Sequence, residues 1–302
     1  MLHNRKQRDY LDPHVLSRLA GLSLFARRPM QGNVSGKHRS PNRGASVEFA
    51  QYRKYVPGDD LRRLDWRTYG RTDRYYVKEF EADTNLRCCF VLDTSGSMNY
   101  RSQQWSKLDY AKRLVGTLAY LAAEQGDAVG ISCVADGIRG ALPPRRNPSH
   151  LRQLFEILDT TLCQGGTQLV PILHELAETT AQRALIILVS DLFVPPEELR
   201  SCFQHLRFRK HDLAIFHLLD PQEIRFQFQR PTRFLDLEGG NPIFVEPSEI
   251  ADRYHRALEE YSESLQRVVL ETAVDYTRVS SDQDYEQVLI EFLTRRMRGR
   301  GG

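Results

Sequence analysis

Short apolar runs alternate with amphipathic stretches through the middle of this chain of 302 residues. Each run is long enough for one strand that is buried on both faces, and residues at helical spacing separate the runs. Runs of this kind are typical of a parallel sheet that helices cover on both sides. The pattern therefore predicts a doubly wound α/β fold with a mostly parallel sheet. The four runs are CCFVLD from Cys88, VGISCV from Val129, ALIILVSD from Ala184 and LAIFHLL from Leu213.

Apolar residues at helical spacing predict the helices between and after these runs. In the first helix, Leu108, Ala111 and Leu114 fall on one face, which would pack on the sheet. The last third of the chain adds a long helix and further short strands. The predicted helices cover residues 107–125, 149–161, 170–182, 197–210, 248–271 and 284–297, and the predicted strands cover 234–237 and 243–245 at the sheet edge and 276–279.

The two ends of the chain are basic, although the formal net charge is only +3. Residues 1–43 hold nine Lys or Arg against Asp9 and Asp12, and four Arg lie from Arg295 onward. Such ends could bind nucleic acid or anionic lipid, but aromatic residues are not interleaved with the basic ones as base stacking requires, so we favour solvated, flexible ends. We expect a basic N-terminal arm over 1–43, a small β-containing subdomain over 44–84, the α/β domain over 85–298 and a flexible tail over 299–302.

Polar residues follow two of the predicted strands and precede one predicted helix. Asp93, Ser95 and Ser97 follow the first strand within DTSGS. Thr167 precedes the third helix, and Asp191 follows the third strand. Loops at the carboxyl ends of parallel strands converge, so we expect these side chains to lie together. Hard cations prefer such oxygen ligands, and the sequence therefore predicts a divalent-ion site, for Mg²⁺ foremost and with Mn²⁺ or Ca²⁺ as alternatives.

The same five residues resemble the metal-ion-dependent adhesion site of von Willebrand factor A domains. The resemblance implies a von Willebrand factor A-like, Rossmann-like fold. It implies that Ser95 and Ser97 bind the ion directly, that Thr167 binds it directly or through water, and that the two aspartates bind it largely through water. One coordination position would stay open for an Asp or Glu of another protein. Taken singly, Asp93, Ser95 and Thr167 have a structural alternative as loop and helix caps.

The segment 48–83 is similar to the signature of bacterial proteins of domain of unknown function 58, and the resemblance extends to Asp191. It implies a partnership with MoxR-type AAA+ ATPases, beside which such proteins are encoded, in maturing or remodelling client proteins. The mixed charges of the segment favour internal ion pairs, and a recognition surface is the functional alternative. The signature residues are Gly58, Asp59, Asp60, Arg62, Asp65, Trp66, Arg67 and Lys78, of which Asp59, Asp60, Arg62, Asp65, Trp66 and Arg67 are our candidates for partner binding.

Several catalytic motifs are incomplete in this chain. The sequence GNVSGKH at 32–38 is one residue short of a phosphate-binding loop, and DTSGS lacks the second Asp of aspartate-nucleophile phosphatases. The sequence HELAE at 174–178 lacks the second His of HExxH, and neither serine lies in GxSxG. We therefore expect a non-enzymatic interaction module, with a Mg²⁺-dependent hydrolase that uses the same site as one alternative and a binder of nucleic acid or membrane surfaces as another.

Location and tolerance to substitution follow from the same patterns. No apolar run approaches the roughly 20 residues of a membrane-spanning helix, and the five cysteines form no CxxC pair, so we expect a cytoplasmic protein without a transmembrane segment. Because the ion site should lie on the rim of the sheet, we expect Thr167→Ala and Asp191→Ala to cost roughly 0.5 kcal/mol, with about 1 kcal/mol more for a lost cap at Thr167.

Overall fold

The computed structural model describes residues 8–24, 47–54, 66–72, 75–82 and 86–298, and the chain divides into two compact units. The smaller unit, Pro29–Asn85, contains strand β1 (Val47–Lys54), helix α2 (Trp66–Thr72) and strand β2 (Tyr76–Ala82). The two strands pair antiparallel, and the rings of Tyr69 and Tyr75 stack with their centroids 4.5 Å apart. The two strands lie within residues 44–84, where we expected a small β-containing subdomain, and the bounds of that subdomain stay a prediction.

A six-stranded sheet forms the centre of the larger unit, which comprises Met1–Arg28 and Leu86–Gly302. The strand order is β10-β7-β6-β3-β4-β5, and all neighbours pair parallel except β5, which pairs antiparallel with β4 at one edge. The mostly parallel sheet that we predicted is therefore confirmed. Its strands are β3 (Arg87–Asp93), β4 (Ala128–Val134), β5 (Ile138–Arg145), β6 (Leu185–Ser190), β7 (Asp212–Leu219) and β10 (Asp275–Ser280).

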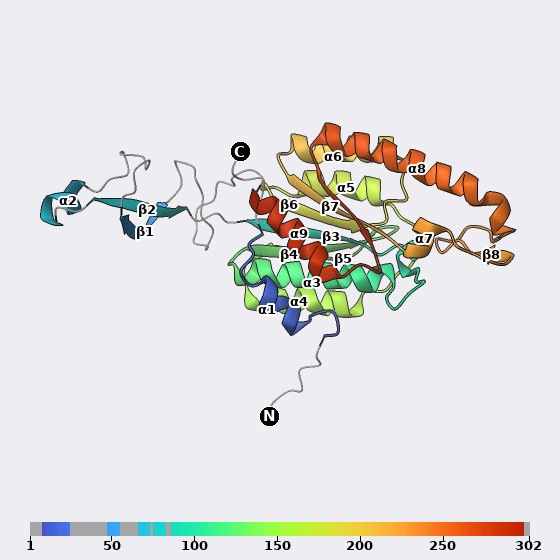
Figure 1. Ribbon diagram of the computed structural model, residues 1–302, viewed down its shortest axis with the longest axis horizontal. Helices are drawn as coiled ribbons and strands as arrows, with labels where there is room; N and C mark the ends of the chain where they lie inside the picture. The colour runs from blue at the N-terminus through green and yellow to red at the C-terminus, as the bar shows by residue number, and fades with distance from the viewer. Residues whose placement is uncertain (1–7, 25–46, 55–65, 73–74, 83–85, 299–302) are drawn as a thin grey trace, which may run out of the picture. The chain divides into compact units, whose positions relative to one another are not determined.

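Helices cover both faces of this sheet (Figure 1). On one face lie α3 (Lys107–Glu124), α4 (Pro148–Thr160) and α9 (Tyr285–Arg298). On the other face, α5 (Leu169–Thr179), α6 (Pro196–Phe208) and α8 (Pro247–Thr272) pack over β6 and β7, where Leu188, Ile215 and Phe203 belong to one buried core. The doubly wound α/β fold class is confirmed.

Strand β5 and helix α7 (Pro221–Arg225) are among the elements that were not predicted. Strand β5 contains Pro143 and Pro144 and is only partly buried, so it lacks the apolar run that marks the inner strands. An edge position tolerates proline because one side of the strand needs no partner. Helix α7 has five residues and begins at a capping box formed by Asp220 and Glu223.

The expected edge strands near residues 234–237 and 243–245 do not join the central sheet. Strands β8 (Thr232–Phe234) and β9 (Ile243–Val245) pair with each other as a separate antiparallel hairpin. The edges of the central sheet are already formed by β10 and β5, and the loop 235–242 is long enough to let the two segments pair locally.

The described part of the predicted N-terminal arm packs on the larger unit. After Arg8, helix α1 (Pro13–Leu19) buries Val15 and Leu19. The hydroxyl of Tyr10 donates hydrogen bonds to Asp159 Oδ1 at 2.7 Å and to the carbonyl of Phe155 at 3.1 Å. Residues 8–24 therefore belong to the α/β body rather than to a flexible arm.

One of the C-terminal arginines is also internal. The side chain of Arg296 is fully buried and ion-pairs with Asp275 at 2.8 Å and with Asp212 at 2.5 Å. The C-terminal basic cluster is thus partly a structural ion-pair network, because Arg296 is not accessible to an outside anion.

Candidate functional site

Asp93 ends β3 at the carboxyl edge of the sheet, and two hydrogen bonds fix its carboxylate. The backbone N–H of Ser95 donates to Oδ1 at 3.0 Å, and Ser190 Oγ donates to Oδ2 at 2.6 Å. The residue is only 1% exposed. Burial, followed by the negative charge of Asp191, raises the pKa of Asp93 to about 6. Asp93 is therefore a fixed carboxylate with a second negative group nearby.

The two serines of DTSGS bring their hydroxyls together. Ser95 Oγ and Ser97 Oγ lie 3.0 Å apart at the start of a short 3₁₀ helix, η2 (Gly96–Asn99). Ser95 is fully buried and Ser97 is half-buried. Between them, the N–H of Gly96 donates to the carbonyl of Gly165 at 2.8 Å, which joins this loop to the loop that carries Thr167.

Thr167 lies on a loop that backbone hydrogen bonds hold against the DTSGS loop. The N–H of Gln164 donates to the carbonyl of Thr94 at 3.0 Å. The Oγ1 atom of Thr167 is buried and has no hydrogen-bond partner among the residues that the structure describes. Gln168, not Thr167, is the N-cap residue of α5, so the alternative role of Thr167 as a helix cap is not observed. A buried hydroxyl without a partner is costly, about 1–3 kcal/mol, and a bound ligand is one group that would satisfy it.

Asp191 follows β6, the neighbour of β3, and its carboxylate accepts a hydrogen bond from a buried lysine. Lys107 Nζ lies 2.8 Å from Asp191 Oδ2 and 2.7 Å from Glu223 Oε1, and the Lys107 side chain is fully buried. Burial alone would lower the pKa of Lys107, but Asp191 and Glu223 together outweigh burial and raise that pKa. Lys107 is therefore charged at neutral pH and neutralises one of the nearby carboxylates.

The charges and ligand atoms of this cluster fit a divalent cation. Asp93, Asp191 and Glu223 bring three carboxylates against the one ammonium group of Lys107, so the cluster keeps an excess of negative charge. The hydroxyls of Ser95, Ser97 and Thr167 add neutral oxygen atoms, the last of them without a partner. Carboxylate and hydroxyl oxygens together form a donor set that suits Mg²⁺. The five residues thus share one edge of the sheet, and their role as ligands stays a prediction.

Two participants were missed from sequence, and most of one predicted set cannot be placed. The role of Lys107 could not be identified from the sequence, because a lysine at the start of a helix is normally solvated. Glu223 could have been found, since Asp220 and Glu223 have the spacing of a capping box just after a predicted strand. Asp59, Asp60, Arg62 and Asp65 lie outside the described residues, while Trp66 and Arg67 begin α2.

The HELAE sequence forms no ion site. His174 Nδ1 lies 2.9 Å from His205 Nδ1, and His205 Nε2 lies 2.7 Å from Glu178 Oε1. These groups form a hydrogen-bonded chain rather than a ring around one point. Within the described ranges, no three His, Cys, Asp or Glu side chains are grouped as ligands of a metal ion, so a site at the sheet edge has to rely on hydroxyl oxygens as well as carboxylates.

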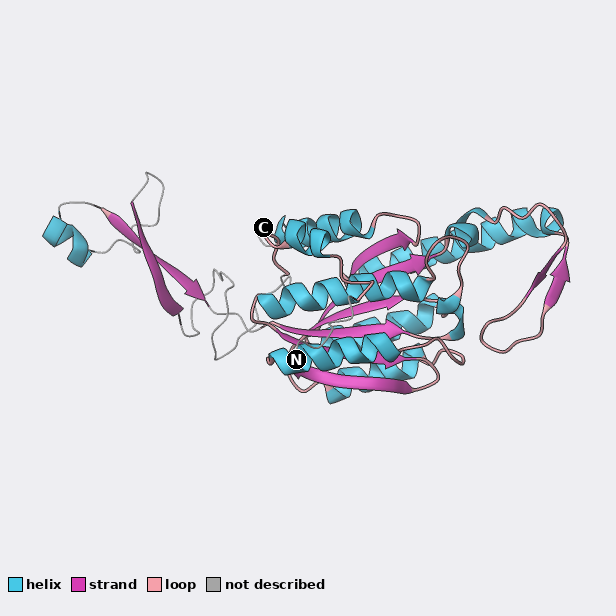
Figure 2. Cartoon of the chain, turned by 90° about the horizontal axis from the view of Figure 1, so that it is seen from below, coloured by secondary structure: helices cyan, strands magenta, loops and turns pink. Residues whose placement is uncertain are grey.

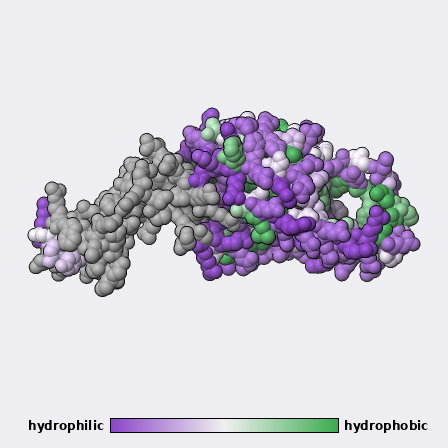
Figure 3. Space-filling view, turned by 90° about the horizontal axis from the view of Figure 1, so that it is seen from above, coloured by the Kyte–Doolittle hydropathy of each residue, from purple (hydrophilic) through white to green (hydrophobic). Residues whose placement is uncertain are grey.

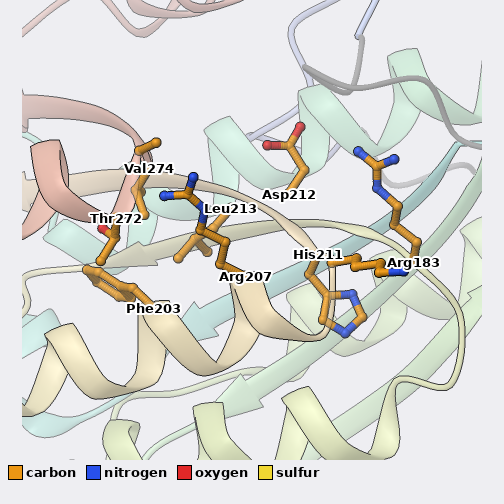
Figure 4. Close-up of a pocket in the computed structure, with 10 residues that line it drawn as sticks. Arg183, Phe203, Arg207, His211, Asp212, Leu213, Thr272 and Val274 are labelled. Carbon is orange, nitrogen blue, oxygen red and sulfur yellow. The ribbon is translucent and has the colours of Figure 1, made fainter.

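A cavity of about 290 Å³ lies at the amino ends of the strands, where β7 begins (Figure 4). Arg183, Arg207 and His211 are among its lining residues. Figure 4 shows their polar ends spread apart rather than directed at one point. Because the cavity lies at the amino ends of the strands and Asp93 lies at a carboxyl end, the cavity is not part of the cluster around Asp93.

Solved structures with a similar arrangement of elements include two of interest. One is an aerotolerance-related membrane protein from Bacteroides fragilis, with 19% identity, a TM-score of 0.44, and coverage of 70% of this chain and 99% of that chain. The other is the VWA domain of SpRpn10, with 12% identity, a TM-score of 0.41, and coverage of 68% and 94%. The first is named as a membrane protein, and the cytoplasmic location that we expected is withdrawn.

Among the helices that the structure describes, none has the length and apolar character to span a bilayer.

Sequence comparisons identify the family. An uncharacterized protein of Mycobacterium tuberculosis is 23% identical over 296 residues, which cover 96% of this chain and 92% of that protein. The model of the family described as "Protein of unknown function DUF58" matches residues 51–264, which is more than half of the chain. On this match, the chain belongs to the DUF58 family.

Proposed function

We propose that this protein is an interaction module without catalytic chemistry of its own, and that it docks a partner through a divalent cation, Mg²⁺ foremost. Ser95, Ser97 and Thr167 would hold the ion through their hydroxyl oxygens. Asp93 and Asp191 would hold it largely through water. When bound, the ion supplies a coordination position for a carboxylate oxygen of an Asp or Glu on the partner.

The buried Thr167 hydroxyl is the observation that carries this proposal. It has no hydrogen-bond partner in the described part of the chain, although the large majority of buried side-chain polar atoms are hydrogen-bonded. It lies on a loop that is hydrogen-bonded to the loop of Ser95 and Ser97, beside a cluster with excess negative charge. A cation bound there would satisfy both the free hydroxyl and the unbalanced charge.

The partner that we propose is a MoxR-type AAA+ ATPase, acting with this protein on a client that supplies the carboxylate. The resemblance of residues 48–83 to the family signature supports this choice, and the signature residues from Asp59 to Arg67 are the second surface that we propose for it. No small-molecule substrate enters this account.

Isothermal titration of Mg²⁺ into the full chain tests the ion site. In Thr167→Val, which removes the hydroxyl and keeps the branched shape, we expect affinity for Mg²⁺ to fall about tenfold or more. In chelator, the same variant should be as stable as the wild type or more stable, by up to about 1 kcal/mol, because it no longer buries an unpaired hydroxyl.

Thr160→Val is the matched control. The hydroxyl of Thr160 bonds to carbonyls of its own helix and is exposed, so Mg²⁺ affinity should not change. A wild-type protein that binds no Mg²⁺, Mn²⁺ or Ca²⁺, or a Thr167→Val variant that binds as tightly as the wild type, would overturn the proposed site.

A further inference from the structure

A loop far along the chain lies directly on the DTSGS loop. It is the connection 235–242 of the β8–β9 hairpin, which projects beyond the carboxyl ends of the strands and turns back toward them (Figure 2). The carbonyl oxygen of Leu237 would lie 1.9 Å from a Cβ atom added to Gly96. The two backbones are thus in contact, and only glycine fits at position 96 beneath this loop.

The side chain of Glu238 is turned toward the candidate ion site. Its Oε2 atom would lie 3.7 Å from a Cβ atom added to Gly166, the residue that precedes Thr167. Glu238 is half-buried, whereas Leu237 and Gly239 on either side of it are exposed. The loop therefore presents one carboxylate toward Gly166, the residue that precedes Thr167.

The other acidic residue of the loop has a different use. Asp236 Oδ1 accepts a hydrogen bond from the N–H of Glu238 at 2.8 Å, and Gly239 has a φ of +106°, a backbone conformation that favours glycine. Asp236 thus shapes the turn, and this turn directs Glu238.

The tip of the hairpin is weakly held, unlike its base. At the base, the Phe226 ring stacks on Phe234 and Tyr254 with centroid distances of 5.7 Å and 4.2 Å. Beyond it, Leu235 of the loop and Ile243 and Phe244 of β9 are each more than 60% exposed, and hydrophobic surface gathers at this end of the α/β unit in Figure 3. Since these side chains bury little apolar area, lifting the tip costs little free energy.

The candidate site is closed in this conformation. Ser95 is 0%, Asp93 is 1% and Asp191 is 2% exposed. Because three of the five candidate ligands are buried, a partner carboxylate needs an opening at the strand ends to reach an ion bound there. The contact of Leu237 with Gly96 makes the loop 235–242 the segment whose movement would provide this opening.

We propose that Glu238 is an internal carboxylate ligand, which takes the coordination position that a partner's Asp or Glu would otherwise fill. This inference rests on the proposed function, because it needs an ion at Ser95, Ser97 and Thr167. The loop 235–242 is then a displaceable cap, and a partner docks by exchanging its own carboxylate for that of Glu238.

Glu238→Gln tests the inference, because it keeps the size of the side chain and removes its charge. With Mg²⁺ alone as the probe, isothermal titration should show about tenfold weaker binding than in the wild type. In parallel, chymotrypsin cleavage at the leucines of the loop should slow at least fivefold on adding Mg²⁺ to the wild type, and should be insensitive to Mg²⁺ in Glu238→Gln. The ratio of cleavage rates with and without Mg²⁺ is taken within each variant. Any effect of the substitution itself on recognition by chymotrypsin therefore cancels.

Glu249→Gln is the matched control, since Glu249 is exposed at the start of α8 and should behave as the wild type. If Glu238→Gln binds Mg²⁺ as tightly as the wild type and keeps the ion-dependent protection, the internal ligand is refuted while the proposed function stands. If the wild type binds no ion, both fail. Both the proposed function and the internal ligand are supported by one combined result. In it, Thr167→Val loses Mg²⁺ binding, while Glu238→Gln binds Mg²⁺ more weakly and shows no Mg²⁺-dependent protection from chymotrypsin.

Discussion

At the scale of single residues, Lys107 changes how the candidate site must be understood. Its ammonium group is fully buried between Asp191 and Glu223, at 2.8 Å and 2.7 Å. Our expectation that Asp191→Ala would cost only as much as a surface substitution is therefore wrong, because Asp191 is 2% exposed and compensates a buried charge.

Asp191→Ala should lower the free energy of unfolding by about 3 kcal/mol, because it leaves Lys107 buried with only Glu223 as a partner. Urea unfolding in chelator measures this without interference from a bound ion. Glu197→Ala is the comparison, since Glu197 is 73% exposed and its ion pair with Arg200 should contribute about 0.5 kcal/mol or less. Equal losses in the two variants would show that Lys107 does not depend on Asp191.

At the scale of elements, β7 and β10 are joined by a buried polar pair. His217 Nδ1 on β7 lies 2.6 Å from the hydroxyl of Tyr276 on β10. Burial lowers the pKa of His217 to about 4, even though the charge of Asp191 acts in the opposite direction. Since an unfolded histidine has a pKa of about 6.5, the unfolded chain binds this proton more readily than the folded protein.

Stability should therefore fall as the pH drops from about 6.5 toward 4. His217 alone should remove about 2 kcal/mol between pH 7 and pH 5. His217→Gln cannot ionise and retains a hydrogen-bonding group for Tyr276, so its loss over this interval should be smaller than that of the wild type by about that amount. Urea unfolding of both proteins at the two pH values provides the measurement, and parallel pH profiles would rule out His217 as the cause.

Elements also show what the sequence can and cannot predict. The inner strands β3, β6 and β7 have continuous apolar runs because both faces are buried, so they could be identified directly. Strand β5 could not, since an edge strand with Pro143 and Pro144 has no such run. The β8–β9 hairpin was predicted as two strands, but its separation from the central sheet was not, because the edges of that sheet are formed by β10 and β5 only in the folded chain.

The candidate site, like the fold, could be predicted only in part from the sequence. Asp93 and Asp191 follow buried strands, and parallel pairing of β3 and β6 brings those strand ends together. The closing of the site by Lys107 and by the loop 235–242 was not predictable, because both contacts join residues that are distant in the sequence.

At the scale of the whole molecule, several charges at the basic ends are already paired. Arg8 lies 3.0 Å from Asp159, Arg18 lies 2.8 Å from Glu286, and Arg296 is fully buried. Cations that pair internally release fewer counterions from a polyanion, so these contacts weaken the alternative of a nucleic-acid or membrane-surface binder. Recognition through the candidate ion site remains the account that we favour.

The affinity of the full chain for a MoxR-type AAA+ ATPase, the partner that we propose, tests this account most directly. The measurement is made at constant Mg²⁺ and nucleotide, so that the ATPase keeps its own cofactor while the docking site is altered by Thr167→Val. We predict at least about tenfold weaker binding for Thr167→Val and unchanged binding for Thr160→Val, because only the former loses a ligand of the docking ion. Equal affinity of the wild type and a Thr167→Val variant that no longer binds Mg²⁺ would contradict ion-dependent docking.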